Sequence, residues 1–308
     1  MKKFLTIGIL FLICGLSVQT AQAQRWQRLR EQLGFSIFTS NFLSDLGGAD
    51  DIGSHRSLKD LDFSMTKPGF GINYAYRLGY RWNWRTNLNM AWLSGYDNAT
   101  SEESRRQRHF NNKTFILELT TQAEFYMTVQ NTHLRYNRQQ QRMPISSYLF
   151  VGIGGIYYNP MGKYTDGKWY SLRSLNTEGQ GLVSTREKYS PVALVVPFGI
   201  GAKYHINKRY MVGLEWGIRW TNTDYLDDVS TSYFNYEDIK AAYGDKAAYF
   251  SNPAYDPDTM TSYPTGTAAG DRRGNPADRD AYMFIQASFL IQLQTGLGGH
   301  FGRTSFTY

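Results

Sequence analysis

The stretch Phe70–Tyr80, with the sequence FGINYAYRLGY, decides the fold because apolar or aromatic side chains alternate with small or polar ones along it. A β-strand directs successive side chains to opposite faces, so this segment predicts a strand with one apolar and one polar face. A soluble sheet would bury the apolar face on a second layer. A closed barrel in a membrane turns that face toward hydrocarbon instead.

Outward from this stretch, the same alternation recurs along the chain. It predicts eight strands, at 33–43, 68–80, 82–94, 114–129, 147–158, 192–206, 209–223 and 281–294. The connections alternate between short and long, and the long gaps are 44–67, 95–113, 159–191 and 224–280. Outer-membrane barrels combine short periplasmic turns with long external loops. The pattern therefore predicts an all-β, eight-stranded antiparallel transmembrane β-barrel over 24–294, with both mature termini in the periplasm of a Gram-negative cell.

The first residues read as an export signal. Lys2 and Lys3 precede an apolar run that ends near Val18, and Ala21-Gln22-Ala23 forms a small-residue cleavage site. This order predicts a signal peptide over 1–23 that is removed from the mature protein. A membrane anchor is the alternative, but the apolar run is short for a span.

The segment 295–308 follows the last predicted strand. We expect it to be a periplasmic tail. The alternative is that its terminal aromatic residue, Tyr308, belongs to the signal that barrel-assembly machinery reads from a final strand.

Composition narrows the possible functions. Without the signal the chain has no cysteine, which excludes disulfides and thiolate catalysis. It keeps 31 basic against 26 acidic residues, a mild net charge of +5 with no lysine-rich tract, so nucleic-acid binding has little support. The 23 Tyr, 18 Phe and 7 Trp suit the aromatic girdles of a membrane barrel.

Charged residues recur on the predicted inward faces of the strands. They are Arg77, Arg85, Glu118, Glu124, Lys203, Glu215 and Arg219. The interior of an eight-stranded barrel is just wide enough for side chains to fill it, and charges there must pair or meet water. We therefore expect a structural ion network that plugs the lumen, with a lined conduction path as the alternative.

No catalytic constellation stands out. A hydrolase of the membrane surface needs a nucleophile, a histidine and an orienting group, yet the chain has no Gly-x-Ser-x-Gly elbow. Only His205 falls on a predicted strand, where a lumen hydrogen bond is the expected role. Phosphate-binding loops and zinc-ligand spacings are also missing from the sequence. The sequence thus predicts a protein that is not an enzyme and uses no cofactor or metal.

Two segments of the long gaps are distinctive. The first contains Glu178, Gly179, Gln180 and Gly181, and the second contains Asp224, Tyr225, Asp227, Asp228 and Ser230. The three aspartates could gather around a cation, because hard metals prefer oxygen ligands. Their spacing does not match a known calcium loop, so we expect a turn in which Asp and Ser side chains bond nearby backbone amides.

These two segments belong to a longer ordered set, which comprises Asn41–Gly47, Thr66–Gly71, Tyr148–Gly154, Asn176–Gly181, Pro197–Gly201, Asp224–Thr231, and Arg273–Asn275 with Asp280. With this set the chain resembles the PorG-type outer-membrane barrels of the type IX secretion system of Bacteroidota. The resemblance implies a scaffold that associates with outer-membrane lipids and with a periplasmic ring of a PorK-like lipoprotein and a PorN-like protein. The system exports proteins and serves gliding motility in some relatives. The insertion near 236–272 departs from the family pattern.

A docking surface can be suggested for such a ring. The connection 130–146 carries a basic cluster, made of His133, Arg135, Arg138 and Arg142, on the predicted periplasmic side. Solvation beside anionic headgroups is an equally simple role for these residues. A small passive pore or a ligand receptor is the alternative function for the whole barrel.

Overall fold

The computed structural model describes residues 30–43, 65–96, 108, 110–128, 144–207, 209–256, 261–262, 266–276 and 279–293. The predicted signal peptide 1–23 and the predicted tail 295–308 lie outside these residues. So do His133, Arg135, Arg138 and Arg142 of the suggested docking surface.

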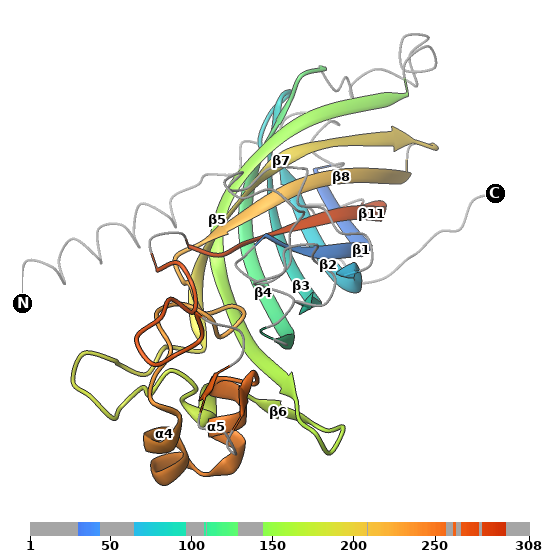
Figure 1. Cartoon of the computed structure of the whole chain (residues 1–308). Helices are drawn as coiled ribbons and strands as arrows, with labels where there is room; N and C mark the ends of the chain where they lie inside the picture. Colours follow the sequence, from blue (N-terminus) through green and yellow to red (C-terminus); the bar gives the residue numbers. More distant parts are fainter. Residues whose placement is uncertain are drawn as a thin grey trace, which may run out of the picture.

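Eight strands form a closed antiparallel barrel (Figure 1). They are β1 (Glu31–Leu43), β2 (Lys67–Arg77), β3 (Trp82–Tyr96), β4 (Asn111–Tyr126), β5 (Ile145–Lys163), β7 (Val192–His205), β8 (Tyr210–Thr221) and β11 (Ala281–Leu293). Each pairs with its neighbours in the chain, and the pairing of β1 with β11 closes the ring. All eight predicted strands and the predicted barrel are confirmed. The largest difference is β5, which extends beyond the predicted 147–158 by five residues at its C-terminal end.

The two ends of the barrel differ in their connections. At one end the strands join through 78–81, 127–144 and 206–209, and Glu31 pairs with Leu293 there, so the first and last strands share this short-turn end. The segments 44–66, 97–110, 164–191 and 222–280 all leave from the opposite, long-loop end. The predicted alternation of short and long connections is therefore confirmed.

Two of the long segments contain regular structure that the alternation did not predict. It comprises β6 (Trp169–Ser171), η5 (Arg173–Leu175), α4 (Tyr236–Tyr243), α5 (Asp245–Ser251), β9 (Tyr255–Asp256) and β10 (Thr261–Ser262). Asn235 begins α4 by accepting hydrogen bonds from the backbone amides of Glu237 and Asp238. We call the described parts of 164–191 and 222–280 the cap, which lies at the long-loop end (Figure 1). No described helix is long and apolar enough to cross a membrane.

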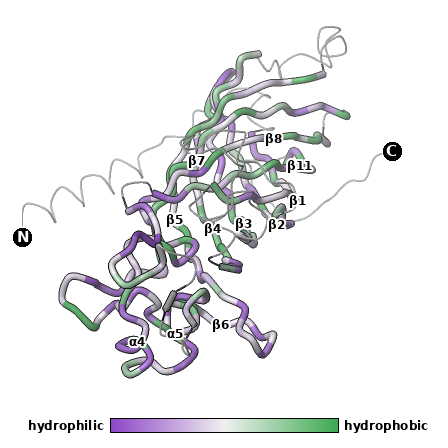
Figure 2. Tube along the Cα trace, in the orientation of Figure 1, coloured by the Kyte–Doolittle hydropathy of each residue, from purple (hydrophilic) through white to green (hydrophobic). Residues whose placement is uncertain are grey.

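The barrel wall follows the alternation read from the sequence (Figure 2). In β2, the outward residues Phe70 and Ile72 are 57% and 49% exposed. Asn73, which follows Ile72 and points inward, is buried. Met283 of β11 departs from this pattern. The alternation predicts that its side chain faces lipid, but it is 1% exposed. The indole Nε1 of Trp216 lies 2.8 Å from its sulfur and helps to cover it.

The long-loop half of the lumen holds a hydrophobic core. Its buried members are Phe38, Phe42, Ala91, Leu93, Ile116, Ile156, Tyr158, Ala193, Val195, Leu226, Tyr282 and Phe284. All but Leu226 come from the barrel strands, and Leu226 reaches in from the cap. The sequence pattern predicted a polar interior, but inward residues near this end are apolar because the cap shields them from water.

Candidate functional site

The first charged cluster lies in the short-turn half of the lumen and joins four strands. The Arg85 guanidinium of β3 is 3.1 Å from the Glu124 carboxylate of β4 and 2.6 Å from that of Glu215 of β8. The Lys203 ammonium of β7 is 3.0 Å from Glu124. All four side chains are at most 4% exposed. Two cations and two anions thus neutralise each other out of contact with water.

Tyrosines complete this cluster. The Tyr126 hydroxyl donates to Glu124 at 2.8 Å and accepts from the Lys203 ammonium at 2.7 Å. The Tyr148 hydroxyl donates to Glu215 at 2.9 Å. A buried ion pair is stable only when hydrogen bonds also satisfy the remaining lone pairs and protons, and these hydroxyls serve that purpose.

The second charged cluster lies nearer the long-loop end. Arg219 of β8 is 3.6 Å from the Glu118 carboxylate of β4, and its guanidinium stacks 4.1 Å from the centre of the Phe284 ring. Glu118 also accepts hydrogen bonds from the Tyr282 hydroxyl at 2.5 Å and from the Asn89 amide at 2.8 Å. The tyrosine hydroxyl and the amide therefore complete the environment of this pair.

The seven charges predicted to line the lumen are all buried, as expected. Six of them form two separate clusters rather than one network, and Arg77 is buried at the short-turn end of β2. His205 makes the lumen hydrogen bond that we predicted, with its Nε2 3.1 Å from the Ser146 hydroxyl. The apolar core and the two clusters occupy successive levels of the lumen. This arrangement favours the predicted plug over a lined conduction path.

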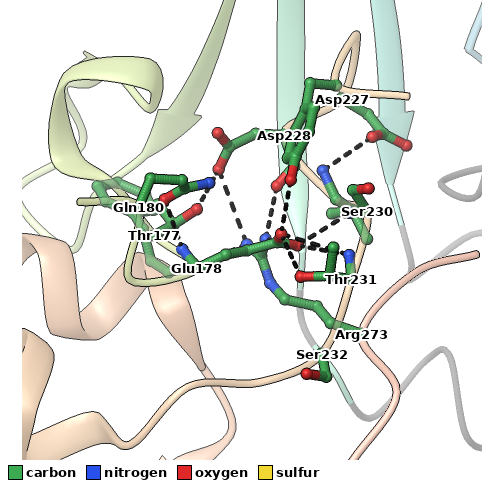
Figure 3. Close-up of polar contacts among 12 residues, drawn as sticks. Thr177, Glu178, Gln180, Asp227, Asp228, Ser230, Thr231, Ser232 and Arg273 are labelled. Atoms are coloured by element: carbon green, nitrogen blue, oxygen red, sulfur yellow. Dashed lines mark hydrogen bonds and ion pairs between the residues drawn. The ribbon is translucent and has the colours of Figure 1, made fainter. Parts of the chain in front are cut away.

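The two distinctive loop segments meet in the cap (Figure 3). The Glu178 carboxylate accepts hydrogen bonds from the backbone amides of Ser230, at 2.9 Å, and Thr231, at 3.2 Å. It also accepts from the hydroxyls of Thr231, at 2.7 Å, and Tyr225, at 3.3 Å. Its charge is balanced by Arg273, whose Nη1 lies 2.9 Å away. Glu178 is 1% exposed, so this carboxylate is a buried joint between two loops.

Asp228 is the second buried carboxylate of the cap. It accepts hydrogen bonds from the Thr177 and Tyr189 hydroxyls, both at 2.5 Å, and lies 3.8 Å from the Arg273 guanidinium. Burial raises the pKa of Asp228 to about 6, although Arg273 opposes that shift. Burial alone would lower the pKa of Arg273, but the carboxylates of Glu178 and Asp228 raise it. The arginine therefore stays charged while Asp228 titrates near neutrality.

The cap is also fastened to the barrel. The Asn112 amide and the Thr114 hydroxyl, both on β4, donate to the backbone carbonyls of Asp227 and Leu226 at 2.6 Å. The Asp280 carboxylate, just before β11, accepts the Leu226 amide at 2.9 Å. These bonds hold the segment that inserts Leu226 into the lumen core. These hydrogen bonds therefore fasten the cap to the long-loop end of the barrel.

The aspartate-rich segment forms a turn instead of a cation loop. Asp227 accepts the backbone amide of Val229 at 3.0 Å, which is the turn bond expected from the sequence. The Asp228 side chain points to the Thr177 and Tyr189 hydroxyls and to Arg273. The backbone of Asp228 is in the left-handed region, with φ of 65°. Within the described part of the chain, no group of three or more His, Cys, Asp or Glu residues could hold a metal ion.

The glycines of the first segment serve its backbone. Gly179 and Gly181 have φ of 75° and 88°, and a side chain at Gly179 would collide with the Phe234 ring. The Gln180 side chain accepts the Glu178 backbone amide at 3.0 Å. These contacts explain why this segment contains Gly-Gln-Gly after its glutamate.

Sequence reasoning missed Arg273 as the centre of the cap. Besides the two carboxylates, it donates to the backbone carbonyl of Asp228 at 2.5 Å and to that of Phe250, in α5, at 3.3 Å. The sequence did contain a signal for this residue, because Arg273–Asn275 is one of the segments in which the chain resembles PorG-type barrels. Periodicity gave no reason to place it opposite Glu178, 95 residues away.

We expect the stability of the cap to fall as the pH rises from about 4 to about 7. Asp228 has a pKa near 6 in the folded cap and about 3.9 when unfolded, so the folded state binds more protons in this window. The shift corresponds to a loss of at most about 3 kcal/mol. Hydrogen exchange of residues 224–231 at several pH values measures it.

Asp228→Asn provides the matched control, because its amide imitates the protonated carboxyl and does not titrate. In this variant the exchange-derived stability should be flat over the same window. A slope equal to that of the unmodified protein would show that Asp228 is not the group responsible.

The closed ring of antiparallel strands, its outward apolar side chains and its filled interior define the class as a membrane-spanning β-barrel. A model of one family matches residues 3–250, most of the chain. The protein belongs to this family, which is described as "Domain of unknown function (DUF6089)". No curated protein sequence matches the chain.

Solved structures similar to this chain are outer-membrane or surface proteins. Neisserial surface protein A is 8% identical, with 85% of this chain and 96% of that chain covered and a TM-score of 0.37. The outer membrane protein OprG of Pseudomonas aeruginosa is 8% identical, with coverages of 87% and 98% and a TM-score of 0.37. The attachment invasion locus protein Ail of Yersinia pestis is 11% identical, with coverages of 85% and 99% and a TM-score of 0.34.

Proposed function

We propose that this protein is a non-enzymatic scaffold of the outer membrane that anchors the periplasmic ring of a type IX protein secretion machine. The single observation that carries the proposal is the occupied lumen of the barrel. Ion clusters, an apolar core and a fastened cap occupy the space that a transport path would need. A barrel closed in this way offers its surfaces, rather than its lumen, for function.

The connections support one orientation in the membrane. The short-turn end would face the periplasm and the cap would face the cell exterior, as in outer-membrane barrels generally. Both barrel termini then lie on the periplasmic side, because Glu31 pairs with Leu293 at the short-turn end. A periplasmic ring would therefore meet the short turns.

The resemblance to PorG-type barrels supplies the proposed partner. Three of the segments that carry it, 176–181, 224–231 and 273–275, converge in one buried arrangement. That convergence supports treating the segments as one structural unit rather than as unrelated similarities. The partners we propose are a PorK-like lipoprotein and a PorN-like protein, together with outer-membrane lipids.

Native co-purification from the outer membrane, followed by mass spectrometry, tests the role. We expect ring proteins to accompany the unmodified protein and to be lost when Arg135, Arg138 and Arg142 are all changed to Glu. A matched control changes the exposed cap residues Arg173 and Lys188 to Glu and should retain the ring. Recovery without any ring protein would contradict the scaffold role, and equal recovery of the ring from both variants would reject the docking surface.

Single-channel recording separates the alternative. The purified protein should show no steady conductance in a planar bilayer, because the lumen is filled. A steady conductance would favour the small pore instead.

A further inference from the structure

An apolar trough of about 690 Å³ lies on the outer wall of the barrel. It crosses six neighbouring strands, β4, β3, β2, β1, β11 and β8, and exposes almost only apolar atoms. On a barrel in a membrane this surface faces hydrocarbon, so whatever fills the trough comes from the membrane and not from water.

The strand register shows how the trough is built. One side is a rung of outward side chains, Val212, Phe289, Phe35, Ile72 and Leu88. The other side is the next outward rung, Ala287, Ile37, Phe70, Met90 and Leu117. The floor is the inward rung between them, Gly213, Ser288, Ser36, Gly71 and Asn89.

Ala287 contributes to the depth of the trough, because it presents only a methyl group where its neighbours present long side chains. The floor between the two outward rungs is backbone, because its residues direct their side chains into the lumen. On that lumen side, a side chain at Gly71 would collide with the Asn89 amide, and one at Gly213 with the Ser288 hydroxyl.

The dimensions of the trough suit one extended hydrocarbon chain. Six strands about 4.8 Å apart give it a length of about 24 Å, and two successive outward residues set its walls about 7 Å apart. An α-helix with its side chains is about 10 Å wide, which is too wide to enter. A second barrel presents a convex wall and would bridge the trough without filling it.

The direction of the trough points to the periplasmic leaflet. It begins at Val212, two residues from the start of β8, and ends at Leu117, nine residues before the end of β4. Strands tilt by about 40° in such barrels, so a row perpendicular to them rises by about 15 Å over its length. That rise equals about half of the hydrocarbon thickness of a bilayer, which is one leaflet.

A cation stands where the headgroup of such a lipid would lie. Arg209 is exposed in the short turn, and its backbone carbonyl accepts the Gln292 amide, which places it at the membrane boundary beside β11. Val212 follows three residues later, in β8. A phosphate at Arg209 and an acyl chain starting at Val212 are therefore compatible with a single molecule.

We propose that the trough is a specific phospholipid site, which holds one acyl chain of a periplasmic-leaflet lipid whose phosphate contacts Arg209. The site rests on the membrane location and on the orientation proposed above, but not on the secretion role, so the two proposals are tested separately. Such a lipid would exchange more slowly than its neighbours around the barrel, because two rungs of side chains surround its acyl chain along the trough.

Native mass spectrometry of the detergent-purified protein, titrated with dioleoyl phosphatidylglycerol, tests the site. We expect one lipid to remain bound at collision energies that remove the others. Ala287→Trp, which fills the trough, should lose that lipid. Ala202→Trp is the matched control, because Ala202 lies on the outer face of β7, away from the trough. Equal retention by both variants, or no retained lipid in the unmodified protein, would overturn the proposal.

A second pair of variants addresses the headgroup. Arg209→Gln should lower the retention of the lipid, whereas Arg81→Gln, at an exposed arginine in another short turn, should not. Unchanged retention in Arg209→Gln would remove the phosphate contact from the proposal. Heat-modifiable migration on a gel shows that all four variants are folded barrels.

Discussion

Arg273→Met should open the cap while leaving the barrel folded. The substitution keeps an unbranched apolar stem but removes the guanidinium, which leaves the Glu178 carboxylate, 1% exposed, without its cation. Removing one partner of a buried ion pair costs about 3–5 kcal/mol. Arg273 also contacts α5 through the Phe250 carbonyl, so the loss is transmitted to the helices of the cap.

Hydrogen exchange measures this opening directly. Amides of 176–181 and 224–231 should exchange at least about a hundredfold faster, since each 1.4 kcal/mol is a factor of ten. Arg272→Met is the matched control, because Arg272 is exposed and its side chain donates to the Gly274 carbonyl rather than to a buried carboxylate. Unchanged protection in Arg273→Met would mean that the arginine does not hold the cap together.

A double variant tests the physical reason. Glu178→Gln with Arg273→Met removes both charges of the closer ion pair, so Asp228 is the one carboxylate of the two facing Arg273 that stays ionisable and buried. We expect this combination to recover much of the stability lost in Arg273→Met alone.

Arg85→Met should destabilise the whole barrel. Arg85 is the cation nearest to Glu215, at 2.6 Å, and it also pairs with Glu124. Lys203 can still neutralise Glu124, but Glu215 would keep the Tyr148 hydroxyl and lose its ion pair. The expected cost is again about 3–5 kcal/mol. It falls on the barrel because the cluster joins β3, β4, β7 and β8.

Urea unfolding in lipid vesicles measures this loss as a lower midpoint. Arg81→Met, at an exposed arginine next to β3, should leave the midpoint unchanged. Adding Glu215→Gln to Arg85→Met should raise the midpoint again. If Arg85→Met unfolds at the same urea concentration as the unmodified protein, the first charged cluster contributes nothing to the stability of the barrel.

The barrel could be predicted because its signal is local. Alternation in Phe70–Tyr80 reports which face each side chain takes, and a closed barrel requires that alternation in every strand. The same logic placed Arg85 and Glu124 inside. It could not say that Glu118 and Arg219 form a separate cluster, because that depends on how the strands are staggered against each other.

The sequence by itself determined the strands, their inward and outward faces and the parity of their connections, because strand geometry makes each of these a property of neighbouring residues. Only the tertiary structure decided what the long segments do. Arg273 meets Glu178, 95 residues away in the chain, and also Asp228. Leu226 enters the lumen core from the cap. Contacts between loops have no period that a sequence can display, since they depend on how closure of the barrel brings the loop ends together.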